Sequence, residues 1–152
     1  MKCNYNKMQA IALIRGKDTS PSIIGTVKFY QKQNCVLVVS DIKNLPHTDT
    51  GFFGFHIHEG TDCGGEGFSD SKSHYNPFGS PHPSHAGDLP PLMLCGNRAY
   101  SSVLTDRFNV SDIIGRTVII HNMPDDFTTQ PSGNAGEKIA CGVIKNNAKH
   151  CM

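Results

Sequence analysis

Long hydrophobic runs are absent from the 152-residue sequence. The longest early apolar run, from Ala10 to Ile14, ends at once at Arg15 and Gly16. A run of this length is too short for a signal-peptide core or for a membrane span. We therefore expect a cytoplasmic protein that has no membrane as a partner.

An excess of charge of either sign is also missing. The chain has 14 Lys and Arg against 13 Asp and Glu, a net charge of +1, and its basic residues are dispersed. Nucleic-acid-binding proteins usually concentrate basic residues on one face, and acidic interaction tails concentrate carboxylates. The composition therefore predicts no nucleic-acid partner. The sequence also contains no internal repeat and no low-complexity tract.

Closely spaced cysteine pairs are missing as well, although the chain contains six cysteines. They are scattered, with no Cys-x-x-Cys pair among Cys3, Cys35, Cys63, Cys95, Cys141 and Cys151. A disulfide framework is typical of small secreted proteins, whereas thiols stay reduced inside cells. From the residues alone, most of these cysteines are expected to be free.

What the sequence does contain is a series of short segments rich in Val, Ile, Phe and Tyr, separated by turn residues. The segments span residues 8–15, 23–31, 34–41, 51–58, 90–95, 98–106, 116–121 and 138–144. Such spacing predicts an all-β sandwich or barrel, and the length fits one domain over residues 1–152. Two long connections, 59–89 and 122–137, are rich in Gly and Pro, and long connections of this kind are usually functional.

Histidines gather around these connections. His56 and His58 would leave the same face of one strand, because strand side chains alternate, while Phe55 and Ile57 would point into a core. His74, His82, His85, Asp88 and His121 follow further along the chain. Taken alone, a His-x-His pair can be a polar strand face and Asp88 a turn former. The convergence of six of the eight histidines favours a metal centre.

The ligand types divide into two sets. Four imidazoles, from His56, His58, His74 and His121, suit Cu(II), which accepts a flattened arrangement of nitrogen ligands. Three imidazoles and a carboxylate, from His74, His82, His85 and Asp88, suit tetrahedral Zn(II). His74 is counted twice, because an imidazole without ring protons offers one nitrogen to each metal. We therefore expect one copper ion and one zinc ion.

At this point the chain resembles the copper/zinc superoxide dismutase family over nearly its whole length. The matching runs are Gly-Phe-His-Ile-His-Glu (54–59), His-Tyr-Asn-Pro (74–77), His-Ala-Gly-Asp-Leu (85–89), Ile-Ile-Gly-Arg-Thr (113–117), Gly-Asn-Ala-Gly (133–136) and Ala-Cys-Gly-Val-Ile (140–144). The resemblance implies an eight-stranded Greek-key barrel of immunoglobulin-like sandwich type. It also implies dismutation of superoxide as substrate, with redox cycling of copper and with zinc holding the bridging His74.

Several residue roles follow from the same resemblance. It implies copper ligation by His56, His58, His74 and His121, and zinc ligation by His74, His82, His85 and Asp88. Asp125 would link a copper histidine to a zinc histidine, as outer carboxylates commonly do. Cys63 and Cys141 would form a disulfide. Residues 59–89 would be the disulfide and zinc loop, residues 122–137 an electrostatic-type loop, and residues 1–7 an N-terminal extension.

The sequence departs from the family pattern around these ligands. The family usually has an arginine where this chain has Lys138, which keeps the charge but loses the planar fork that gives two hydrogen bonds. Lys138 is therefore expected to support a reduced but substantial rate. The 122–137 loop is shortened, and residues 127–136 carry no charge, so steering by this loop should be weak.

Partners and rival functions follow from the same comparison. Ile113, Ile114 and Gly115, which belong to an interface in the family, predict a homodimer, and a copper chaperone is a further partner. A non-enzymatic copper-binding or copper-delivery protein is the main rival to an enzyme. A zinc hydrolase is a third candidate, but it needs an open zinc position, and four ligands already fill the zinc set.

Overall fold

The computed structural model describes residues 7–147, so Cys3, Cys151 and nearly all of the expected 1–7 extension lie outside the described residues. Within that range the chain is almost entirely β-structure, and the all-β prediction is confirmed. The elements are β1 (Ala10–Gly16), β2 (Ile24–Gln31), β3 (Val36–Lys43), β4 (Phe52–Phe53), β5 (Phe55–His58), the 3-10 helix η1 (Glu66–Ser71), β6 (Leu92–Met93), β7 (Arg98–Thr105), α1 (Val110–Ile113), β8 (Thr117–His121) and β9 (Lys138–Asn146).

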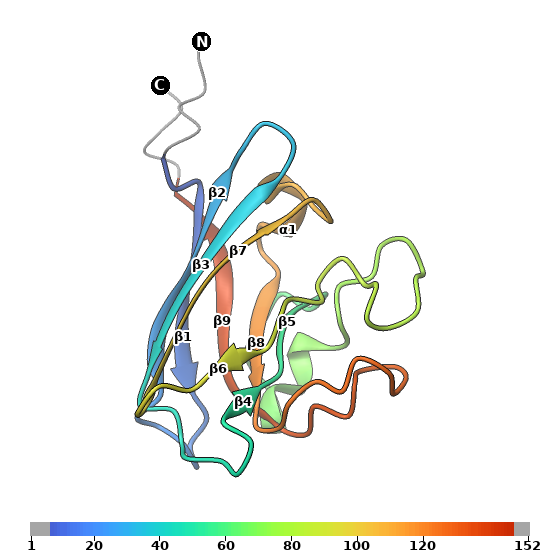
Figure 1. The fold of residues 1–152 in the computed structure, drawn as a ribbon. Coiled ribbons are helices and arrows are strands. Elements are labelled where there is room, and N and C mark those ends of the chain that lie inside the picture. Colours follow the sequence, from blue (N-terminus) through green and yellow to red (C-terminus); the bar gives the residue numbers. More distant parts are fainter. Residues whose placement is uncertain (1–6, 148–152) are drawn as a thin grey trace.

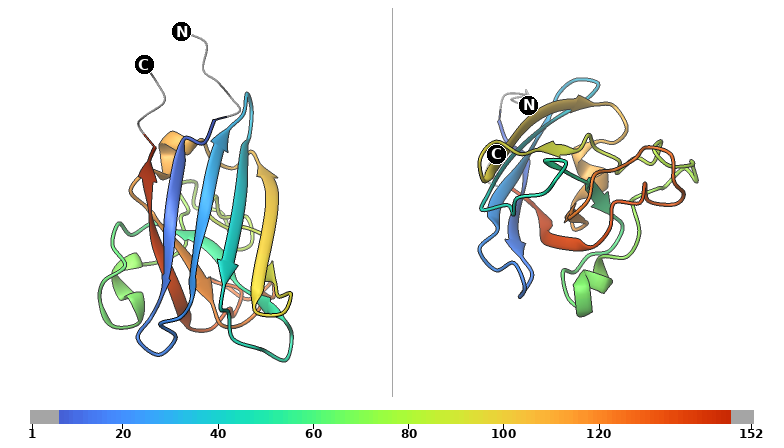
Figure 2. Two further views of the ribbon diagram at one scale, coloured as in Figure 1. Left: turned by 90° about the vertical axis from the view of Figure 1, so that its left-hand side faces the viewer. Right: turned by 60° about the horizontal axis from the view of Figure 1, so that its bottom comes forward.

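Seven of the strands form one curled antiparallel sheet in the order β5-β8-β9-β1-β2-β3-β7 (Figure 1). The two remaining strands, β4 and β6, form a small separate sheet. After β3 the chain crosses to β5 at the opposite edge and later returns to pair β7 with β3. This return is a Greek-key connection, and the curl of the sheet is visible in both views of Figure 2.

The predicted strand at 51–58 is instead two strands in different sheets. Phe52 and Phe53 pair with β6, whereas β5 pairs with β8. The change occurs at Gly54, whose N–H donates to Met123 O at 2.7 Å and whose carbonyl accepts from His121 N at 2.8 Å. A Cβ atom at Gly54 would lie 2.8 Å from Ala135 Cβ, so only glycine fits this crossing point. The 90–95 segment likewise shortens to β6.

Alternate side chains of the large sheet pack into one hydrophobic core. Val27 and Phe29, which the sequence places on one face of β2, are both completely buried. Phe55 and Ile57 enter the same core from β5. Burial of apolar side chains on this scale is the main term that stabilises such a fold.

Strands β5 and β8 are buried on both faces along their whole length. One face meets the core, and the outer face lies under the two long loops. Loop 59–89 contains η1, which the sequence did not predict because helical periodicity is weak there. No helix in residues 7–147 has the length and apolar character needed to cross a membrane.

Candidate metal centre

Three histidines lie side by side on the outer face of β5 and β8. His56 and His58 come from β5, opposite Ile119 and Thr117 of β8, and strand alternation places His121 on the same face. The ring centroids of His56 and His121 are 4.9 Å apart, and those of His58 and His121 are 5.4 Å apart. All three side chains are buried.

Loop 59–89 brings a fourth histidine to this group because its main chain bonds to β5. Ile57 N donates to Gly87 O at 2.8 Å, and Tyr75 N donates to Ile57 O at 2.8 Å. A Cβ atom on Gly87 would collide with Ile57 O, so the loop can approach this closely only with glycine there. His74 consequently stacks near His56, with 4.0 Å between the ring centroids.

Hydrogen bonds at the outer nitrogens fix how these rings are protonated. A carbonyl can only accept, so His58 Nδ1 donates to Lys72 O at 2.7 Å and His121 Nδ1 donates to Gly136 O at 3.2 Å. In the neutral rings both Nε2 atoms are then bare, and they face each other at 3.3 Å. His56 Nε2 donates to Asp125 Oδ2 at 2.7 Å, so its buried Nδ1 is bare as well.

Burial keeps these rings neutral. It lowers the pKa of His56 and His58, and it lowers the pKa of His121 to about 3, with the neighbouring His56 adding to that shift. Three bare nitrogens, His56 Nδ1, His58 Nε2 and His121 Nε2, thus lie close together, and none of the described residues donates a hydrogen bond to them. Such an arrangement is unfavourable unless a cation sits between the nitrogens, so the donor set fits a nitrogen-preferring metal ion.

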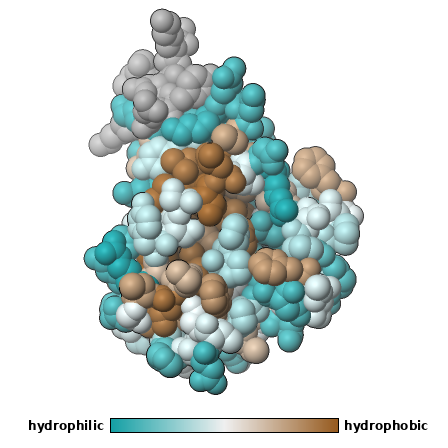
Figure 3. All heavy atoms as spheres, in the orientation of Figure 1, coloured by the Kyte–Doolittle hydropathy of each residue, from teal (hydrophilic) through white to brown (hydrophobic). Residues whose placement is uncertain are grey.

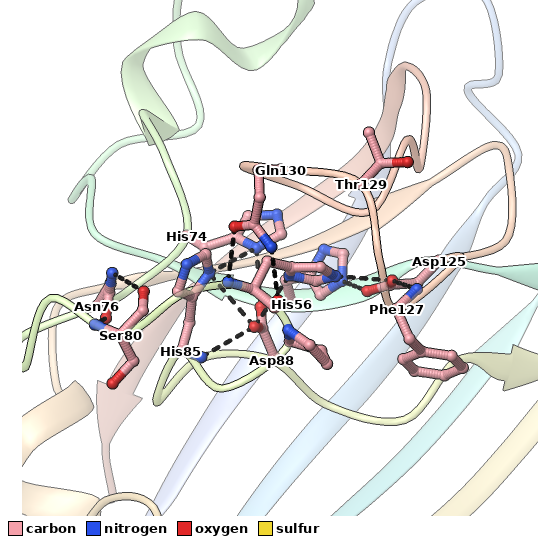
Figure 4. A network of polar contacts seen from close by, with 12 residues as sticks. His56, His74, Asn76, Ser80, His85, Asp88, Asp125, Phe127, Thr129 and Gln130 are labelled. Carbon is pink, nitrogen blue, oxygen red and sulfur yellow. Dashed lines mark hydrogen bonds and ion pairs between the residues drawn. The ribbon is translucent and has the colours of Figure 1, made fainter.

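A second set surrounds Asp88, and Figure 4 shows His74 and His85 close to this carboxylate. Asp88 Oδ1 lies 2.8 Å from His74 Nδ1, and Oδ2 lies 3.0 Å from His82 Nδ1 and 3.3 Å from His85 Nδ1. Burial raises the pKa of Asp88, but hydrogen bonding to His74 and the nearby histidines outweigh it and leave the pKa below its usual value. Three imidazoles and a carboxylate match the zinc preference.

His74 belongs to both sets. Its Nδ1 faces Asp88, whereas its Nε2 is buried and has no hydrogen-bond partner among residues 7–147. Within each set the candidate ligand atoms all lie within 4.8 Å of one another. The geometry therefore brings together every residue that the sequence assigned to the two sets.

Asp125 joins the two sets from the second loop. Its Oδ2 bonds His56 Nε2 at 2.7 Å, and its Oδ1 bonds His82 Nε2 at 2.8 Å (Figure 4). Burial raises the pKa of Asp125, but these two hydrogen bonds outweigh it and hold the pKa well below the usual range. Gly133 is packed against this contact, since a Cβ there would collide with Asp125 Oδ1 and His82 Nε2.

A cavity of about 520 Å³ opens beside the first set and is lined by His58, His74, His121 and Lys138 together with residues of both loops. Lys138 reaches it because β9 places it opposite His121. Its Nζ donates to Ser71 Oγ at 2.8 Å, to Lys72 O at 2.9 Å and to Phe68 O at 3.4 Å. Partial burial lowers the pKa of Lys138. An ammonium thus held supplies positive charge to the cavity.

Cys63 and Cys141 form the disulfide expected from the family resemblance, with a Cα–Cα distance of 5.8 Å. It ties loop 59–89 to β9. Cys35 and Cys95 are free thiols, the first partly buried and the second exposed. Two of the four described cysteines are therefore free, whereas the residues alone predict that most are.

Comparison with known proteins agrees with this site. A family model described as copper/zinc superoxide dismutase (SODC) matches residues 23–144. A relative from Legionella pneumophila, "Superoxide dismutase [Cu-Zn]", is 38% identical over 82% of this chain and 80% of its own length. Two Aquifex aeolicus relatives, "Superoxide dismutase [Cu-Zn] 2" and "Superoxide dismutase [Cu-Zn] 1", are 32% and 34% identical over 84% and 80% of this chain and 82% and 80% of their own lengths.

Proposed function

The chain belongs to the copper/zinc superoxide dismutase family, and we propose from this premise how its buried histidines serve that activity. The protein is an oxidoreductase that converts two superoxide anions and two protons into dioxygen and hydrogen peroxide, with copper and zinc as cofactors. The observation that carries the residue assignment is the pair of bare Nε2 atoms of His58 and His121 facing each other at 3.3 Å.

We assign copper to His56, His58, His74 and His121, and zinc to His74, His82, His85 and Asp88. Bound copper supplies one-electron redox chemistry, which zinc cannot. Hydrogen bonds from the outer nitrogens to Lys72 O, Gly136 O and Asp125 keep three copper histidines in one orientation, so no ring has to turn during the reaction. His74 Nε2, which has no competing partner among the described residues, is the atom that would hold a proton for the peroxide product.

Asp125 has a positioning role in this assignment. Its carboxylate accepts hydrogen bonds from His56, a proposed copper ligand, and from His82, a proposed zinc ligand. A movement of either histidine would therefore change the position of the other through Asp125.

A superoxide-scavenging assay on protein loaded with both metals tests the function directly. We expect catalysis that requires copper, with a rate that increases in proportion to the copper content. Binding of both metals without catalysis would instead favour a copper-binding or copper-delivery protein on the same barrel.

Lys138 is proposed to attract superoxide by charge. Its three hydrogen bonds hold its ammonium group to residues 68–72. Lys138 therefore attracts the anion as a point charge, without the paired hydrogen bonds that a planar guanidinium group can donate. Lys138→Met should lower the rate constant about tenfold at low ionic strength and flatten its salt dependence. Lys138→Arg should raise the rate constant.

Stopped-flow measurements at several salt concentrations check this expectation, with Lys43→Met, an exposed lysine at the end of β3, as the matched control. If Lys138→Arg left the rate constant unchanged across ionic strength, the assigned role of this position would be wrong.

A homodimer remains a prediction from the family resemblance. Ile113 is buried in the core of its own barrel, so Ile114, which is 37% exposed, offers the apolar side chain for a contact. Figure 3 shows a cluster of apolar residues on the face that it draws, which is an observation independent of Ile114. Sedimentation at micromolar concentration should give a dimer, and a monomer alone would rule it out. A copper chaperone and a cytoplasmic location also remain predictions from the sequence.

A further inference from the structure

Gln130 makes an unusual contact between the two long loops. Its Nε2 donates to His82 O at 2.7 Å, and its Oε1 accepts from His82 N at 2.9 Å. One side-chain amide therefore satisfies both main-chain polar groups of a candidate zinc ligand, across 48 residues of sequence. Figure 4 shows Gln130 lying over the histidine cluster with these bonds directed into it.

The segment that carries Gln130 is tightly bonded to itself. Asp126 Oδ1 accepts from Thr128 N at 2.9 Å and from Thr129 N at 2.8 Å. Gly133 N donates to Thr129 O at 2.7 Å, and Asp126 N donates to Gly133 O at 2.9 Å. Because these bonds close the turn, residues 126–133 should move as a unit.

The same unit forms part of the copper cavity. Pro131 and Ser132, which follow Gln130 directly, line the cavity together with His58, His74 and His121. His82 is thus bonded to the side chain of Gln130, and the cavity wall directly follows Gln130 along the chain. Asp125 is hydrogen-bonded to the ring of His82, whereas Gln130 is hydrogen-bonded to its main chain.

We propose that Gln130 is a positioning residue that couples zinc binding at His82 to the position of the cavity wall at residues 131–132. The proposal rests on the assignment of zinc to His74, His82, His85 and Asp88. Bound zinc would hold His82 in one position. The two hydrogen bonds between His82 and the Gln130 amide would then hold residues 126–133 in place. Coupling between two sites is reciprocal, so loss of the amide should also weaken zinc binding.

Arg107 provides a comparison on the same zinc-ligand segment. Its Nη1 donates to Pro83 O at 2.8 Å, to His85 O at 3.2 Å and to Asp88 O at 3.3 Å. It supports the zinc ligands through their main chain from the side of β7, and these bonds lead to loop 59–89 and not to residues 126–133. Replacing it should weaken zinc binding without uncoupling the cavity wall.

The test uses the full chain loaded with copper, with and without added zinc. Hydrogen exchange of residues 126–136 is measured together with zinc affinity by chelator competition. In the unmodified protein, zinc should increase protection of this segment. Gln130→Met keeps the side-chain length but loses both bonds, so it should lower zinc affinity about tenfold. It should also reduce the zinc-dependent protection by at least about half even at saturating zinc, the remainder passing through the bond of Asp125 to the His82 ring.

Two further variants separate coupling from general damage. Arg107→Met should also bind zinc more weakly, but at saturating zinc it should show the protection of the unmodified protein. Gln33→Met, at an exposed position in the turn between β2 and β3, should change neither quantity. If Gln130→Met keeps normal zinc-dependent protection at saturation, the proposal is overturned. If the unmodified protein binds no zinc at this site, the assignment of zinc to His74, His82, His85 and Asp88 is wrong. The affinity measurement shows this independently of the hydrogen-exchange result.

Discussion

Replacing His74 with alanine is expected to remove most of the superoxide dismutase activity, with a loss on the order of 100-fold or more, since loss of an outer partner of a metal ligand alone costs about 10- to 100-fold. His74 is the one residue common to both ligand sets. Its Nδ1 faces Asp88, and its Nε2 is buried toward the other three histidines. Loss of the ring therefore weakens both sites together.

Metal content measured beside the rate makes this prediction specific. His74→Ala should bind less copper and less zinc, whereas His58→Ala should lose copper alone and His85→Ala should lose zinc first. His47→Ala, an exposed histidine outside both sets, is the matched control and should leave both metals bound. A His74→Ala protein that kept full copper and zinc and more than about a tenth of the rate would contradict the shared ligand.

Loss of the disulfide is expected to have the largest effect on stability. Cys63 and Cys141 are separated by 78 residues, and closing a loop of that length should stabilise the folded chain by about 4 kcal/mol, because the unfolded chain is restricted. Cys141 is buried in β9, so Cys141→Ala avoids placing a new hydroxyl in the core. Urea unfolding of the oxidised protein and of Cys141→Ala, each under the same metal conditions, measures the difference.

Cys95→Ala is the matched control for this experiment, because Cys95 is an exposed free thiol and its loss should change the free energy of unfolding by less than about 0.5 kcal/mol. A difference below about 1 kcal/mol between the oxidised protein and Cys141→Ala would mean that the cross-link adds little. Treatment of the unmodified protein with a thiol reductant should reproduce the effect of Cys141→Ala. It should destabilise Cys95→Ala by the same amount, because that variant keeps the disulfide, and should leave Cys141→Ala unchanged.

Local patterns predicted much of this molecule because they follow from strand geometry. The alternation around His56 and His58 placed both imidazoles on one face, and Phe55 and Ile57 in the core, as the structure has them. Ligand chemistry divided the histidines into two sets that share His74, and the structure brings the same residues together. The pairing of Cys63 with Cys141 depended on family resemblance, since spacing alone offered no partner.

Contacts between distant loops could not be read from the sequence. Gln130 looks like any polar loop residue, because its function depends on main-chain atoms 48 residues earlier. The same holds for Arg107, whose partners are three carbonyls, and for Ser71, which holds Lys138. The prediction of one strand over residues 51–58 was wrong at Gly54. Hydrogen bonds of Gly54 with Met123 and His121, and not local strand propensity, divide β4 from β5 there. These features have no periodicity from which to predict them.

The two metals differ in how much of the fold must open to release them. Three of the proposed copper ligands, His56, His58 and His121, lie on paired strands, whereas His74, His82, His85 and Asp88 all lie on loop 59–89. Loops commonly open locally at lower free energy than the paired strands of a sheet. Zinc should therefore exchange with the surroundings at the rate of loop opening, while the three strand histidines keep copper in place through many such openings. The kinetic lifetime of each metal is thus set by where its ligands lie along the chain.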